Sequence, residues 1–345
     1  MALTYRTRRF LQHLWTVLLV LVLLAALAWI VWILWLDRFV VYSRDGAKFD
    51  FDRPHASLSG ELAIPPEGQE TIPIIYNDNA ANINGNTELT QINGYYADAA
   101  ALREDIDSIR ARIDTLPPGS AVMLDLKTIN GYFYYSTEVG PISSSVDPTE
   151  VDQLITYLNS KDLYLIARIP AFRDYYYGLN YTSNGLFMES NPIGLWMDED
   201  GCYWLDPTKE GTLNYLTRIV AEIKRMGFDE VVFSDFCFPD TDDIQFDGDQ
   251  TQAIADAATT LATISASETF CVSFCSETTG FTLPAEERCR LYLVNFTAAQ
   301  VRSAAENTGL EDPEIRVVFI TEHGDTRFNE FSVMRPVSLI RYEED

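Results

Sequence analysis

The chain has 345 residues, 47% of them hydrophobic, and a formal net charge of -26 at pH 7. This length and composition predict one large globular domain, or two small ones, with a sizeable core. The negative charge excludes nucleic acid as an expected partner, because an acidic surface repels a polyanion. It argues equally against a surface that binds anionic lipid head groups.

Residues 14–36 form an apolar run without a charged residue. At about 1.5 Å per residue, a helix of this length crosses a hydrocarbon core of ~30 Å. Arg6, Arg8 and Arg9 precede the run, so the positive-inside rule places residues 1–13 in the cytoplasm. A cleaved signal peptide is the alternative, but its apolar region is only about 7–15 residues long. We therefore expect an uncleaved signal-anchor that crosses the bilayer of the cell membrane once, followed by an extracytoplasmic domain.

Cysteine and histidine usage predicts neither a metal nor another cofactor. The five cysteines are too scattered for a disulfide framework. Cys271 and Cys275 lie on one expected strand, roughly 13 Å apart, which is beyond the reach of a disulfide. The three histidines, His13, His55 and His323, form no zinc-ligand spacing.

Residues 37–90 are rich in turn-forming residues and are expected to be an extracytoplasmic connector, with one candidate short strand at 72–76. From residue 91 onwards, apolar runs of strand length alternate with amphipathic helical stretches. The first such stretch carries Leu102, Ile106, Ile109 and Ile113 at helical spacing. The apolar runs lie at 94–97, 121–126, 163–169, 230–233, 270–274, 291–296 and 316–320.

This alternation predicts βαβ units and a parallel sheet that is buried on both faces. Seven strands in about 230 residues, without a glycine-rich turn after the first, favour a TIM-like (β/α)8-type barrel over a doubly wound sheet. The barrel domain is expected at residues 91–325. The eighth strand is not obvious, and its candidate is the segment 331–340, so residues 326–345 are either the last strand or a C-terminal tail.

Active sites of such barrels lie at the carboxyl ends of the strands. Taken singly, each polar residue there is more typical of a structural role, such as an ion pair of Arg168 with Asp125 that Lys127 joins as a third member. Four acids at one predicted rim nevertheless point to a site. The candidates are Asp125 and Lys127 after the second strand, Arg168 at the end of the third, Asp235 after the fourth, Glu277 after the fifth, Asn295 in the sixth, and Glu322 with His323 after the seventh.

One connection, residues 171–207, has no clear helical pattern and is rich in aromatic residues. A long loop of this kind inside a compact domain is typically functional. Aromatic faces beside Asn and Asp side chains suit a sugar ring, which has an apolar face and polar edges. The alternative is that the aromatic residues form a small core of the loop itself, with Trp196 and Trp204 as its first members. The predicted sugar-contacting residues are Tyr175, Tyr176, Tyr177, Trp196 and Trp204.

Four segments carry a family resemblance: LDLKTINGYFYY (124–135), LYLIARIPAFRD (163–174), GLWMDEDGCYWLDP (194–207) and GFDEVVFSDFCFP (227–239). Their order and spacing resemble the Putative glycosyl hydrolase domain, a bacterial barrel group related to glycoside hydrolases and often found in envelope proteins. The resemblance covers roughly residues 92–325. The family's usual form after the fourth strand is F-D-Y-x-R-F-P. In this chain the acid, Asp235, comes one position later and Cys237 replaces the arginine.

The resemblance implies a membrane-anchored, extracytoplasmic glycoside hydrolase that acts on a cell-envelope or environmental polysaccharide through paired carboxylates. We expect Asp235 and Glu322 to form that pair, with Glu277 as the substitute for either. Asp125, Lys127 and Arg168 are expected to orient the site, and Asn295 to contact substrate. The alternatives are a non-catalytic carbohydrate-binding barrel and an anchored scaffold protein of the envelope.

Overall fold

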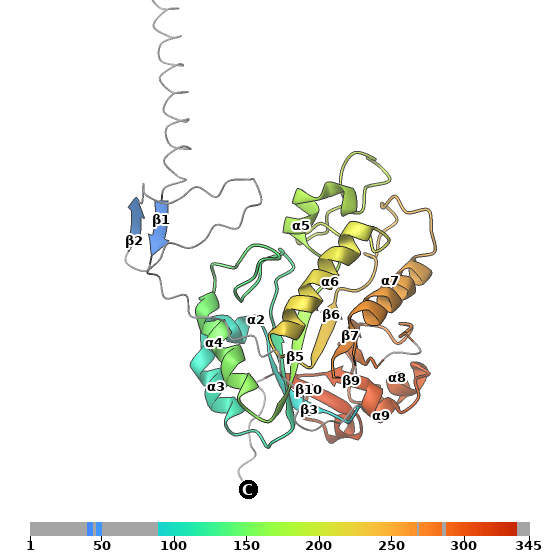
Figure 1. Ribbon diagram of the computed structural model, residues 1–345. Coiled ribbons are helices and arrows are strands. Elements are labelled where there is room, and N and C mark those ends of the chain that lie inside the picture. Colours follow the sequence, from blue (N-terminus) through green and yellow to red (C-terminus); the bar gives the residue numbers. More distant parts are fainter. Residues whose placement is uncertain (1–39, 44–45, 50–88, 268, 285–287, 337–345) are drawn as a thin grey trace, which may run out of the picture. The chain divides into compact units, whose positions relative to one another are not determined.

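The computed structural model describes residues 40–43, 46–49, 89–267, 269–284 and 288–336 (Figure 1). The chain divides into two compact units, residues 1–72 and 73–345, each of which is described by itself. The expected membrane span at 14–36 and the candidate strand at 72–76 lie outside the described residues. Within the described part of the chain, no helix has the length and apolar character needed to span a bilayer.

The described residues of the first unit form a β-hairpin. Strand β1 (Val40–Ser43) pairs antiparallel with β2 (Gly46–Phe49), and Val40 lies opposite Phe49. The sequence pattern predicts no strand at these positions, only a turn-rich connector.

The second unit is a closed barrel in which eight strands of the described chain run parallel, so the predicted TIM-like architecture is confirmed. The strand order around the ring is β10-β3-β4-β5-β6-β7-β8-β9. The eighth strand lies in the candidate segment 331–340, and it closes the ring by pairing with both the first and the seventh. The strands are β3 (Asn93–Ala97), β4 (Ser120–Asp125), β5 (Leu163–Pro170), β6 (Glu230–Ser234), β7 (Cys271–Ser276), β8 (Leu291–Leu293), β9 (Val317–Ile320) and β10 (Ser332–Pro336).

Helices surround this barrel (Figure 1), and their buried apolar stripes join one large core cluster with the outward-facing strand residues. The first predicted helical stretch is in fact two helices, because Asp105 is extended and its carboxylate accepts the Ser108 N–H at 3.1 Å. An N-cap of this kind begins a new helix. The helices are α2 (Ala99–Glu104), α3 (Ile106–Ile113), α4 (Pro148–Asn159), α5 (Tyr175–Asn180), α6 (Glu210–Arg225), α7 (Gln250–Ser265), α8 (Val301–Asn307) and α9 (Pro313–Arg316), with short 3₁₀ turns η1 (Thr182–Asn184) and η2 (Thr326–Glu330).

A second, smaller cluster fills the inside of the barrel. It includes Met123, Ile166, Val232, Val318 and Met334, all fully buried. These residues alternate along their strands with residues of the outer cluster, as the two-residue period of a strand requires. Apolar side chains on both faces explain why the strands are continuous apolar runs in the sequence.

The amino-terminal end of the barrel is closed by a buried ion pair. Arg290 Nη1 lies 2.6 Å from Glu230 Oε2, and both side chains are almost fully buried. Tyr164 donates its hydroxyl to the same Glu230 oxygen at 2.9 Å, and Arg290 also donates to the Thr90 carbonyl at 2.9 Å. We call these residues the floor. A closed floor leaves the opposite end, where the strands finish, as the place for a site.

Candidate active site

Inward-facing residues at the carboxyl ends of β3, β4 and β5 form one hydrogen-bonded group. Tyr96 donates its hydroxyl to Asp125 Oδ2 at 2.8 Å, and Arg168 Nη1 lies 3.1 Å from Asp125 Oδ1 and 2.8 Å from the Tyr96 oxygen. Burial and the Asp125 charge raise the pKa of Tyr96. Burial opposes the charge of Arg168, but the negative charge of Asp125, together with Tyr96 and Cys275, outweighs it, so the pKa of Arg168 is raised. The expected ion pair of Arg168 with Asp125 is therefore present.

Lys127 does not join this pair, so the expectation of a third member is wrong. Its ammonium lies 2.8 Å from Asp174 Oδ2, and both side chains are fully buried. It also donates to the Pro170 carbonyl at 2.9 Å. Strand β4 ends at Asp125, and Lys127 bridges to Phe133 in the loop that follows, which turns its side chain away from Asp125. Lys127 is therefore enclosed, where it fixes the start of the 171–207 connection.

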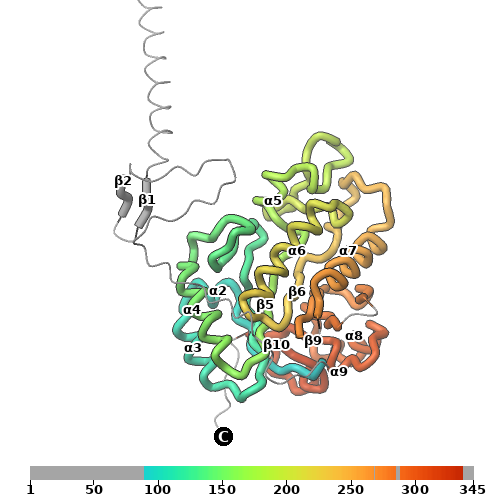
Figure 2. Tube along the Cα trace, viewed as in Figure 1, coloured from blue at the N-terminus to red at the C-terminus, as the bar shows by residue number. Residues whose placement is uncertain are grey.

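The 171–207 connection contains helix α5, so the expectation of a loop without a helix is wrong. Asp174 caps α5 by accepting the Tyr177 N–H at 2.8 Å, while its other oxygen accepts the Tyr215 hydroxyl at 2.8 Å. The connection rests on the loop after β4, because the Tyr175 and Tyr176 N–H groups donate to carbonyls of residues 129 and 130. Figure 2 shows both segments at the same end of the barrel.

The three consecutive tyrosines of α5 have different surroundings. Tyr177 stacks on Tyr215 with ring centroids 4.0 Å apart, so it belongs to the packing of α6. Tyr175 stacks on Tyr203 at 5.3 Å, and the Tyr176 ring lies 6.1 Å from the exposed ring of Tyr132. All three tyrosines of α5 are half-buried. Tyr176 with Tyr132 is therefore the better candidate for contact with a sugar.

Trp196 and Trp204 pack against each other with ring centroids 6.4 Å apart. Trp204 is buried and donates its indole N–H to Asp198 at 2.9 Å, whereas Trp196 is half-buried. This arrangement is the small loop core that the sequence left open as an alternative.

Asp235 lies in the turn directly after β6, where its backbone has a φ of 52°. This left-handed conformation is uncommon for a residue other than glycine. The segment that follows β5 holds it, since Phe172 donates its N–H to the Asp235 carbonyl at 3.3 Å. The carboxylate of Asp235 has no hydrogen bond or ion pair with any described residue. Ser234, the last residue of β6, is buried, and its hydroxyl lacks a partner within the described chain.

Asp235 and Glu277 both act electrostatically on the same two thiols, Cys237 and Cys275. Desolvation, followed by the negative charges of Asp235 and Glu277, raises the pKa of Cys237 to about 12. Burial likewise raises the pKa of Cys275 to about 11, with Arg168 opposing and the same two carboxylates contributing. Glu277 is exposed and accepts the Asn295 side-chain amide at 3.1 Å. Asn295 has a φ of 66°, which explains why β8 ends at Leu293 and not at the predicted residue 296.

Glu322 lies apart from this group. It is exposed after β9, and no hydrogen bond, ion pair or pKa effect connects it to Asp235 within the described residues. Strand β6 pairs directly with β7, which Glu277 follows, whereas Glu322 follows β9, three strands away around the ring. The arrangement therefore favours Glu277 as the acid near Asp235.

Residues 101–298 match the family described as Putative glycosyl hydrolase domain. The chain belongs to this family. Among solved structures, a hypothetical protein from Ruminiclostridium thermocellum ATCC 27405 is 19% identical with a TM-score of 0.45, and the match covers 52% of this chain and 96% of that one. A GH36 alpha-galactosidase from Geobacillus stearothermophilus is 11% identical with a TM-score of 0.50, and the match covers 74% of this chain and 40% of that one.

A beta-N-acetylhexosaminidase from Bacteroides fragilis NCTC 9343 is 13% identical with a TM-score of 0.46, covering 68% of this chain and 50% of that one. The chain thus spans half or less of the length of these two named enzymes. At such identities the likeness concerns the barrel fold alone. No curated protein matches the chain.

Arg173 is a further charged residue at the carboxyl end of the barrel, and it is not among the residues predicted from the sequence. Its Nε lies 2.6 Å from Asp198 Oδ2, and its Nη2 pairs with Asp200. Burial opposes its charge, but these carboxylates and Asp235 together raise the pKa of Arg173. The segment IPAFRD could have indicated this residue. Arg173 comes directly after the strand that contains Arg168, at the start of the aromatic 171–207 connection.

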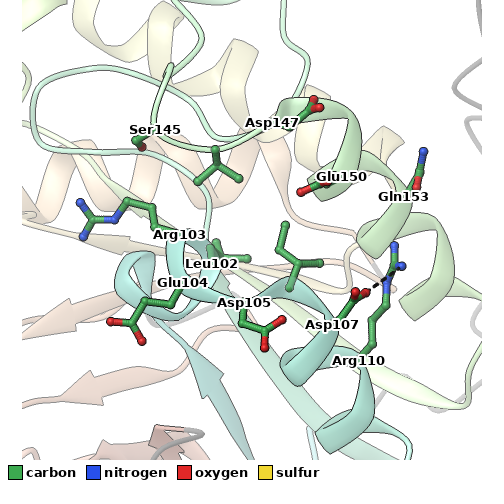
Figure 3. Close-up of a pocket in the computed structure, with 12 residues that line it drawn as sticks. Leu102, Arg103, Glu104, Asp105, Asp107, Arg110, Ser145, Asp147, Glu150 and Gln153 are labelled. Atoms are coloured by element: carbon green, nitrogen blue, oxygen red, sulfur yellow. Dashed lines mark ion pairs between the residues drawn. The ribbon is translucent and has the colours of Figure 1, made fainter. Parts of the chain in front are cut away.

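A groove of about 370 Å³ lies on the flank of the domain, between α3 and the start of α4 (Figure 3). Its walls include Asp105, Asp107, Asp147 and Glu150, and the Arg110–Asp107 ion pair lies at its edge. Residues of α2 and of the loop before α4 complete its lining, so the groove lies among helices on the outside of the barrel. Within the described residues, no three His, Cys, Asp or Glu side chains are arranged to hold a metal ion.

Proposed function

We propose that this domain is a glycoside hydrolase whose catalytic carboxylates are Asp235 and Glu277. The observation that carries the proposal is their common position, since both affect the same two thiols and follow neighbouring strands. Neighbouring strands lie about 4.8 Å apart, and catalytic carboxyl groups need about 5–5.5 Å for retention or about 6.5–9.5 Å for inversion. One carboxyl group acts as general acid and the other as nucleophile or base.

The neighbouring residues then have supporting roles. Arg168 and Asp125 line the inner wall and hold each other's orientation, and their side chains remain partly exposed, at 24% and 13%. Asn295 holds Glu277 through its amide. The rings of Tyr132 and Tyr176 supply an apolar face for a sugar ring.

The proposed substrate is a polysaccharide of the cell envelope or the environment, hydrolysed outside the cell membrane. This part of the proposal depends on residues 14–36, whose apolar run and preceding arginines are typical of a single-pass anchor. Protease added to intact cells should then degrade the barrel domain, and alkaline extraction should leave the chain in the membrane. Recovery of a soluble form that begins near residue 29 would contradict the anchor.

The catalytic assignment is tested by isosteric variants. Asp235→Asn and Glu277→Gln should each lower kcat by about 10²–10⁴-fold on any oligosaccharide that the protein hydrolyses, because each loses proton transfer or nucleophilic attack. Release of reducing ends measures the rate, and urea unfolding checks the fold. Glu322→Gln is the matched control and should keep the wild-type rate. If Glu322→Gln is inactive and Glu277→Gln is active, Glu322 is the partner of Asp235.

A second candidate function is favoured by Ser234. Its unpartnered hydroxyl lies at the last position of β6, where the family pattern has its acid. A barrel that has lost this acid binds sugar without hydrolysing it. Wild-type protein that binds oligosaccharides without turnover, together with hydrolysis gained by Ser234→Asp, would support this function over the first.

A further inference from the structure

At the mouth of the barrel, which is the end where the strands finish, three cations are each paired with a carboxylate. Lys127 is fully buried against Asp174, and Arg168 lies 3.1 Å from Asp125. Arg173 lies against two carboxylates. None of these three cations is therefore free to bind an anionic group without first losing a carboxylate partner.

Part of the negative charge at the mouth is not neutralised. Asp235 and Glu277 have no ion pair within the described residues, and the single charge of Arg173 is shared between two carboxylates, Asp198 and Asp200. Lys127, Arg168 and Arg173 thus lie among more carboxylates than they can neutralise, namely Asp125, Asp174, Asp198, Asp200, Asp235 and Glu277. A group with a negative charge would meet repulsion from whichever of Asp235 and Glu277 is ionised, and this repulsion is strongest near Asp235, the less exposed of the two.

We propose that the mouth selects glycans without acidic groups, namely uncharged or amino-bearing sugars, and rejects uronic acids, sulfated sugars and sugar phosphates. The inference rests on the proposed function and names the substrate class of the same site. The rejection comes from the two carboxylates without an ion pair and from the pairing of Lys127, Arg168 and Arg173 with carboxylates. The hydroxyl groups of an uncharged sugar can donate hydrogen bonds to these carboxylates, and the amine of an amino sugar can form an ion pair with them.

The test uses the full-length protein and paired probes that differ by one charged group. Neutral hexose oligosaccharides are each compared with the derivative oxidised at C6 to the uronate, and binding is measured by titration calorimetry. The neutral member should bind at least about tenfold more tightly at 0.01 M salt. The ratio should shrink at about 1 M salt, where the screening length falls from ~30 Å to ~3 Å.

A pair of charge-reversal variants locates the effect. Asp200→Lys changes an exposed residue beside Arg173, and Asp107→Lys makes the same change in net charge on the flank helix α3. Asp200→Lys should reduce the preference for neutral sugars about three- to tenfold, and Asp107→Lys should leave it unchanged. Equal effects of the two variants would overturn the assignment to the mouth, because the preference would then reflect total charge.

The outcomes separate this inference from the function on which it rests. Uronates that bind as tightly as their neutral partners at low salt would overturn the inference and leave the glycoside hydrolase intact. Failure to bind or hydrolyse any neutral or oxidised member of the panel would overturn the proposed function itself.

Discussion

The two ends of the barrel use the same kinds of side chain in opposite ways. At the floor, Glu230 and Arg290 form an ion pair with almost no solvent exposure. At the mouth, Arg168 and Asp125 form a pair that stays partly exposed, and Asp235 nearby has no cation of its own. Barrels of this type place stability at the amino-terminal end of their strands and chemistry at the carboxyl end. The difference between the two pairs indicates which charges this chain uses for folding and which remain available for a ligand.

The largest expected effect on stability comes from a variant that breaks the ion pair of the floor. Arg290→Met removes one partner of a fully buried pair and leaves Glu230 unpaired, which should lower the free energy of unfolding by about 3–5 kcal/mol. Urea denaturation measures the change. The double variant Glu230→Leu with Arg290→Met removes both charges and should recover most of the loss. A double variant as unstable as the single one would show that shape, and not the unpaired charge, causes the loss.

The next prediction concerns the pH dependence of stability at Asp229, which lies beside the floor residue Glu230 in the sequence. Asp229 precedes β6, and burial raises its pKa to about 6, although its carboxylate accepts the Leu165 N–H at 2.8 Å. The folded state then binds the proton more tightly than the unfolded state, so this residue makes stability fall as pH rises from about 4 to about 6. Asp229→Asn keeps the hydrogen-bond acceptor and should raise stability at pH 7 by up to about 3 kcal/mol.

The check on Asp229 is the pH dependence of urea unfolding. The variant should lose the decrease that the wild type shows across that interval, and the two proteins should have similar stability near pH 4. A wild type whose stability rises between pH 4 and pH 6, by an amount that the variant also shows, would contradict the assignment.

The smallest expected effect on stability comes from the mouth. Arg168→Met leaves Asp125 unpaired, but Asp125 keeps hydrogen bonds from the Tyr96 hydroxyl and the Ala99 N–H, and it is partly solvated. The loss of unfolding free energy should therefore be about 1–2 kcal/mol, well below that of Arg290→Met. Oligosaccharide binding should weaken in this variant and remain unchanged in the double floor variant. A stability loss as large as that of Arg290→Met would remove the distinction between the two ends.

Much of the candidate site could be predicted from the sequence, because it depends on where strands end. A strand-length apolar run followed by an acid brings Asp235 to the carboxyl end of a parallel barrel, and the same rule applies to Glu277 and Asn295. The rule fails for Lys127, which is two residues past the end of β4 and bends into the 171–207 connection. The choice between Glu277 and Glu322 was also beyond the sequence, since both follow strands of similar pattern.

The sequence by itself determined the barrel. The period of its apolar residues selects strand or helix at each segment, and this choice depends on local spacing alone. Only the tertiary structure decided which charges pair, because a pair depends on side chains that are distant in sequence, such as Lys127 with Asp174 or Glu230 with Arg290. It also decided the direction of the Asp235 and Asn295 side chains, because both residues have a left-handed backbone. Such a conformation costs energy in the isolated chain and persists because packed neighbours, such as Phe172 beside Asp235, hold it.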